Sequence, residues 1–160
     1  MSILEGLRMK SIKQQLKLIA ALCAIAGSSF AAASPVGHLG VKQGECNTAT
    51  DYCVYIVGDN TIADSSPVNA DAYISVIIGG TEYKNSDKFS VSQSRGVLAA
   101  VNAQEMKEMN VSDVIVGVDT IDGKNISNCL IKASGEQIAP GTHTITLYKS
   151  NGGVGCKTQW

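Results

Sequence analysis

Four cysteines in the later part of the chain carry the clearest chemical information: Cys46, Cys53, Cys129 and Cys156. Structural zinc sites use cysteines two to four residues apart, and redox-active pairs have two residues between them. The separations here match neither pattern. Residues 1–33 have the pattern of an export signal, and an even number of cysteines in an exported chain predicts two disulfides. Three pairings are possible, and we favour Cys46–Cys53, which closes a short loop, and Cys129–Cys156, which ties the C-terminal segment to a strand.

Two histidines, His38 and His143, are the candidate general bases of a hydrolase. A Ser–His–Asp triad needs a histidine that is oriented by a carboxylate and lies beside a nucleophile. The sequence contains no G-x-S-x-G nucleophile elbow, and Ser94-Arg95-Gly96 does not replace one. His143 alternates with Ile145 and Leu147, which predicts a histidine at the edge of the core. Our leading interpretation therefore has no catalytic residue. A small secreted hydrolase is an alternative hypothesis.

Met106, Met109 and His143 are the candidate ligands of a metal, because Cu(I) prefers thioether and imidazole donors. A spacing of three residues between methionines is also what core packing on a helix produces. Periplasmic copper handling is thus a second alternative hypothesis. The leading interpretation has no bound metal and no cofactor.

Two further sets of oxygen donors have simpler explanations. Asp119, Asp122 and Asn125 could approach a calcium ion, but their spacing differs from that of an EF-hand loop, and Asp and Asn are common in turns. Glu105 and Glu108 could form the carboxylate pair of a glycosidase. Sugar clefts are lined by aromatic side chains, and these make up only 5% of the chain. We therefore expect a hairpin turn and a solvated helix face.

The N-terminal segment has the pattern of a bacterial export signal, which we assign to residues 1–33 with Met9 as the start. A basic start, an apolar run and a small-residue cleavage site follow one another: Lys10, Lys13 and Lys17; Leu18–Ala26; Ala31–Ala33. The apolar run is too short for a stable transmembrane helix, so we expect no membrane anchor in the mature chain. The mature protein is predicted to be secreted or periplasmic.

The remaining chain is predicted to have a flexible lead-in over residues 34–45 and a single domain over 46–160. Short runs rich in β-branched and aromatic residues predict strands, and Gly79-Gly80 and Asp122-Gly123 predict hairpin turns. The segment 97–109 predicts one short helix, because it contains many good helix formers, such as Ala103, Gln104 and Glu105. The run Ala139–Leu147 is similar to the last strand of many bacterial immunoglobulin-like modules. We therefore expect a mostly β, immunoglobulin-like β-sandwich of six or seven strands, with one short helix and two disulfides.

Hydrophobic content and net charge exclude some classes of function. The chain of 160 residues is 44% hydrophobic, enough for a buried core, and its formal net charge is −1. Beyond position 33, nine basic and thirteen acidic residues remain, a net charge of −4. That charge argues against binding to nucleic acid, which depends on contacts between basic residues and phosphates. The leading hypothesis is a non-enzymatic exported protein that acts by surface contact with a protein, host or envelope partner.

Overall fold

The structure, a computed structural model, describes residues 39–160. The expected signal peptide with its start at Met9, residues 34–38 of the expected lead-in and the candidate His38 lie outside the described residues. Within the described part, the chain forms ten strands in two sheets, one α-helix and one short 3₁₀ helix. The prediction of a mostly β fold with one short helix and two disulfides is confirmed.

The first sheet has the strand order β1-β5-β2-β9-β10. Its strands are β1 (Val41–Lys42), β5 (Val97–Asn102), β2 (Asp51–Gly58), β9 (Gly141–Ser150) and β10 (Gly153–Gln159). Neighbouring strands are antiparallel except β2 and β9, which run parallel over seven residue pairs. This parallel pairing brings the first half of the domain beside its last part.

The second sheet has the order β4-β3-β6-β7, and β8 also pairs with β6. Its strands are β4 (Thr81–Val91), β3 (Val68–Ile78), β6 (Val111–Ile121), β7 (Lys124–Asn125) and β8 (Leu130–Ser134). All pairings in this sheet are antiparallel. The two predicted hairpin turns lie between β3 and β4 and between β6 and β7, and both central residues of each turn have positive φ, as primed turns require.

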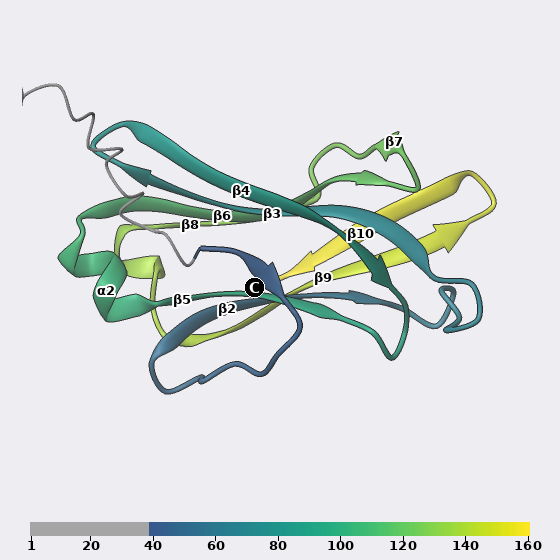
Figure 1. Ribbon diagram of the computed structural model, residues 1–160, viewed down its shortest axis with the longest axis horizontal. Helices are drawn as coiled ribbons and strands as arrows, with labels where there is room; N and C mark the ends of the chain where they lie inside the picture. The colour runs from purple at the N-terminus through teal and green to yellow at the C-terminus, as the bar shows by residue number, and fades with distance from the viewer. Residues whose placement is uncertain (1–38) are drawn as a thin grey trace, which may run out of the picture. The chain divides into compact units, whose positions relative to one another are not determined.

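The two sheets form two layers around a shared hydrophobic core (Figure 1). Residues of the core cluster alternate along the central strands, for example Ile74 and Val76 in β3 and Val54 and Ile56 in β2. Such alternation is expected where one sheet face packs on the core and the other meets water. No helix within residues 39–160 is long and apolar enough to cross a membrane.

The two sheets are joined by hydrogen bonds at one edge and by a disulfide at the other. On one side, β1 pairs with β5 of the first sheet, and the Asn85 side chain in β4 of the second sheet donates a hydrogen bond to the Leu39 carbonyl (N···O 2.6 Å). On the other side, the Cys129–Cys156 disulfide links β10 to the residue that precedes β8. The Cys46–Cys53 disulfide fixes the loop before β2. Both favoured cysteine pairings are thus the ones that the structure contains.

Several predicted elements differ in the structure. There are ten strands in the described residues, not six or seven, so the immunoglobulin-like assignment stays a prediction. The predicted helix over 97–109 is wrong in its first half, because residues 97–102 form β5. Six residues of β5 pair with β2, and Val97, Leu98 and Ala99 are buried. Pairing and burial outweigh the high helix propensity of alanine there, because tertiary contacts override such propensities. Part of the expected lead-in is also structured, since Leu39 is buried and β1 follows it.

Candidate functional site

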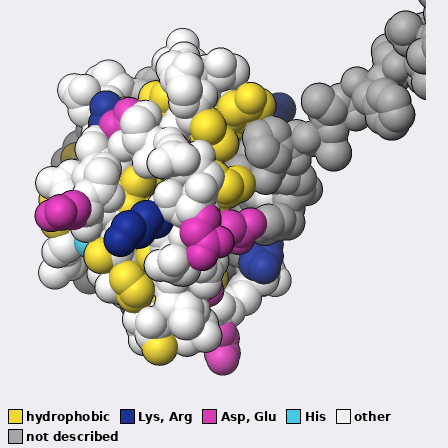
Figure 2. Space-filling model, turned by 90° about the vertical axis from the view of Figure 1, so that its left-hand side faces the viewer, with side chains coloured by type: hydrophobic (Ala, Val, Ile, Leu, Met, Phe, Trp, Pro, Cys, Tyr) yellow, Lys and Arg dark blue, Asp and Glu magenta, His cyan; other side chains and the backbone are white. Residues whose placement is uncertain are grey.

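A cleft of about 800 Å³ lies at the end of the sandwich that carries α2 (Ala103–Glu108). Three segments distant in sequence line it: residues 49–50, residues 102–111 and residues 135–140. Figure 2 looks onto this end, where hydrophobic side chains are exposed around a basic side chain and neighbouring acidic side chains. Known small-ligand pockets have comparable volumes.

The α2 wall of the cleft is held by its N-terminus and by one buried side chain. Asn102 caps the helix, because its side-chain oxygen accepts a hydrogen bond from the Glu105 N–H (3.0 Å). The Ala103 N–H donates to the Thr50 carbonyl (3.0 Å), which joins the helix to the loop before β2. Met106 is only 2% exposed and belongs to the core cluster. The helix is therefore anchored on the sandwich.

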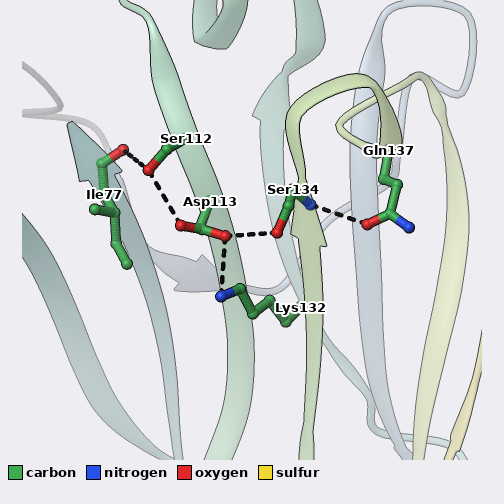
Figure 3. A network of polar contacts seen from close by, with 6 residues as sticks. All are labelled: Ile77, Ser112, Asp113, Lys132, Ser134 and Gln137. Carbon is green, nitrogen blue, oxygen red and sulfur yellow. Dashed lines mark hydrogen bonds and ion pairs between the residues drawn. The ribbon is translucent and has the colours of Figure 1, made fainter. Parts of the chain in front are cut away.

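The opposite wall begins with η1 (Gly135–Gln137), which a polar network holds (Figure 3). Ser134 donates from its hydroxyl to Asp113 (2.5 Å), and its N–H donates to the Gln137 side-chain oxygen (3.2 Å). Lys132 pairs with the same Asp113 carboxylate at 3.0 Å. The hydrogen bonds from Ser134 and Lys132 lower the pKa of Asp113 below its ordinary value of 3.8. Asp113 is thus ionised at neutral pH and fixes the start of this wall.

The cleft carries one charge of each sign on separate walls. Lys107 lies on α2 and Glu136 on η1, and both side chains are exposed. The ion pairs within residues 39–160 are Lys84–Asp119 and Lys132–Asp113, so neither charge in the cleft is part of one. Both charges are available to a bound molecule.

His143 lies near this end on β9, but its contacts are those of a core-edge side chain. Its ring centroid is 4.8 Å from that of Tyr52 and 6.0 Å from that of Trp160. Its Nδ1 atom is buried and has no hydrogen-bond partner within the described residues. Burial lowers the pKa of His143 below its ordinary value of 6.5. Within residues 39–160, this imidazole makes no hydrogen bond with a carboxylate or a hydroxyl, and the hydrolase hypothesis stays a prediction.

Like Nδ1 of His143, the hydroxyl oxygen of Tyr52 is buried without a hydrogen-bond partner in the described residues. This leads to a prediction about stability. The residue is 1% exposed, its hydroxyl makes no hydrogen bond in the described part of the chain, and burial raises its pKa to about 12. A buried polar group without a partner destabilises the folded state. Tyr52→Phe should therefore raise the free energy of unfolding in urea by about 1 kcal/mol.

Tyr55→Phe is the matched control, because the Tyr55 hydroxyl accepts a hydrogen bond from the Cys46 N–H (3.1 Å). The loss of that bond should lower the free energy of unfolding by about 1 kcal/mol, the opposite sign. If both variants lose stability equally, the Tyr52 hydroxyl has a partner such as a buried water shared with His143.

The other predicted donor sets are not gathered into sites. Met106 is in the core and Met109 is half-buried against it, while the ring contacts of His143 are with Tyr52 and Trp160, so copper binding stays a prediction. Asp119 pairs with Lys84, and Asp122 accepts from the Asn69 N–H (2.8 Å) in the hairpin turn. In residues 39–160, no group of three or more His, Cys, Asp or Glu side chains could hold a metal ion. Glu108 accepts from Gln104 on the surface of α2 (3.0 Å).

Sequence reasoning missed the cleft because its residues form no motif. Lys107 and Glu136 are separated along the chain and look like ordinary surface charges, and only the folding of three segments brings their walls together. The arrangement offers apolar surface and two opposite charges, which are means of binding. Comparison with known proteins found no matching family, no similar curated protein and no similar solved structure.

Proposed function

We propose that this chain is an exported, non-enzymatic binding protein that acts in the periplasm or outside the cell through the cleft beside α2. Its partner is a protein of the envelope, the surroundings or a host. The observation that carries the proposal is the cleft itself, with its apolar lining and its unpaired charges of opposite sign. Two disulfides support export, because such bonds persist in oxidising compartments.

The rigidity of the cleft walls supports recognition. Binding is weakened by the entropy of ordering flexible groups, so a site that is already fixed loses less affinity on binding. Here Met106 and the Asn102 cap fix one wall, and the Asp113 network fixes the start of the other. Loops held on a rigid β scaffold are a common way to present binding residues. An immunoglobulin-like sandwich remains our proposal for the scaffold.

Site-specific photocrosslinking in producing cells tests this function. The photoreactive residue p-benzoylphenylalanine replaces Gln104, which is exposed in the cleft, or Gln93, which is exposed in the turn between β4 and β5 at the other end of β5. The expected result is a discrete protein adduct, outside the cytoplasm, from the Gln104 position and none from Gln93. Equal adducts at both positions, or none at Gln104, would overturn the cleft as the contact surface. Four free thiols in the native protein would overturn export into an oxidising compartment.

A further inference from the structure

The opposite charges of the cleft restrict what can occupy it. Lys107 and Glu136 come from different segments of the lining, which also includes the apolar side chains of Val111, Ile138 and Pro140. A ligand that complements this surface has a negative group, an apolar middle and a positive group. Like charges placed opposite these residues would be repelled, which is how charge patterns exclude wrong partners.

The backbone along the same wall offers a hydrogen bond to an extended chain. Ala139 is exposed and lies outside every helix and strand. Within the described residues, its N–H makes no hydrogen bond, whereas the neighbouring Ile138 N–H is bonded to the Gly135 carbonyl. A free main-chain donor beside apolar subsites is the feature by which proteins bind extended peptides, since main-chain bonds give affinity and side-chain pockets give specificity.

Other ligand classes fit less well. The cleft lining contains no Phe, Tyr or Trp on which a sugar ring could stack. It has a single lysine and a single glutamate, which is a poor match for the repeated phosphates of nucleic acid. A peptide fits the alternation of charge and apolar surface and can use the Ala139 N–H.

We infer that the cleft binds an extended peptide segment of the partner that carries an acidic residue, an apolar centre and a basic residue in linear order. The acidic residue contacts Lys107 and the basic residue contacts Glu136. This inference rests on the proposed function and names the chemistry of the partner at that same site.

The test uses the disulfide-bonded exported protein, labelled with ¹⁵N, and three blocked six-residue peptides. All three share a centre of alternating valine and alanine, and they end in aspartate and lysine, in two lysines or in two aspartates. Amide shifts of the protein report where each peptide binds and how tightly. The mixed-end peptide should shift amides of residues 102–111 and 135–140 and should bind more tightly than the others by about threefold for each opposite-charge contact.

Two charge reversals should change the preference in opposite directions. Lys107→Glu should make the peptide with two lysines the tightest, and Glu136→Lys should do the same for the peptide with two aspartates. Lys88→Glu, an exposed reversal on β4, is the matched control and should leave the order unchanged. The amide spectrum of each variant shows that it is folded.

Three outcomes would overturn the inference: no peptide shifts the cleft amides, all three bind equally in every variant, or the neutral sugar maltotriose shifts these amides and the peptides do not. The Gln104 adduct separates this failure from failure of the proposed function. An adduct without peptide binding leaves the cleft as a contact surface with a different ligand class, and absence of the adduct removes both.

Discussion

Replacing both Cys129 and Cys156 by alanine should lower the free energy of unfolding by about 3–4 kcal/mol. The two residues are 27 positions apart, and a cross-link that closes a longer loop removes more conformational entropy from the unfolded chain. The Cys46–Cys53 disulfide closes a loop of only seven positions. Replacing both of its cysteines by alanine should therefore lower the free energy of unfolding by about 2 kcal/mol. Urea denaturation followed by circular dichroism measures both losses.

The position of the Cys129–Cys156 disulfide also predicts which part of the structure loosens when it is removed. Cys156 lies in β10, the outermost strand of the first sheet, and Cys129 precedes β8 in the second. Without the disulfide, amides of β10 should exchange with solvent faster than they do in the disulfide-bonded protein. Amides of β2, in the centre of the sheet, should change less. Equal losses in the two double variants, or unchanged exchange in β10, would show that the bridge does not hold this edge.

Signals that depend on a few neighbouring residues predicted the corresponding parts of the fold. The Gly79-Gly80 and Asp122-Gly123 turns were predictable because primed turns need positive φ, which glycine adopts freely and aspartate tolerates. The cysteine pairing that we favoured is the one in the structure, although the sequence alone left three pairings open. The alternation of His143 with Ile145 and Leu147 gave the inward face of β9, and the structure places all three as predicted.

Features that depend on distant pairing were not predictable from one sequence. The segment 97–102 is rich in alanine, and only its pairing with β2 makes it a strand. Residues 153–159 contain two glycines and few apolar side chains, yet they form β10 because β9 pairs with them at seven positions. The cleft has the same origin, since its walls come from segments that meet only after both sheets have formed.

Met106→Ala should lower the free energy of unfolding by about 3 kcal/mol, the usual cost of truncating a fully buried methionine. Met106 is 2% exposed and is the buried side chain in the middle of α2. A helix of six residues is unstable in isolation, so α2 depends on this contact with the core. Amides of residues 103–109 should therefore exchange faster in the variant, as hydrogen-exchange mass spectrometry would measure, and the photoadduct at Gln104 should weaken.

Two further methionine variants separate anchoring of α2 from a general loss of packing. Met109 is half-buried against the same core, and Met109→Ala should cost about 1 kcal/mol and leave exchange in α2 nearly unchanged. Met106→Leu keeps most of the buried volume and should retain both the helix and the adduct. If Met109→Ala loosens α2 as much as Met106→Ala does, Met106 is not the specific anchor of this wall of the cleft.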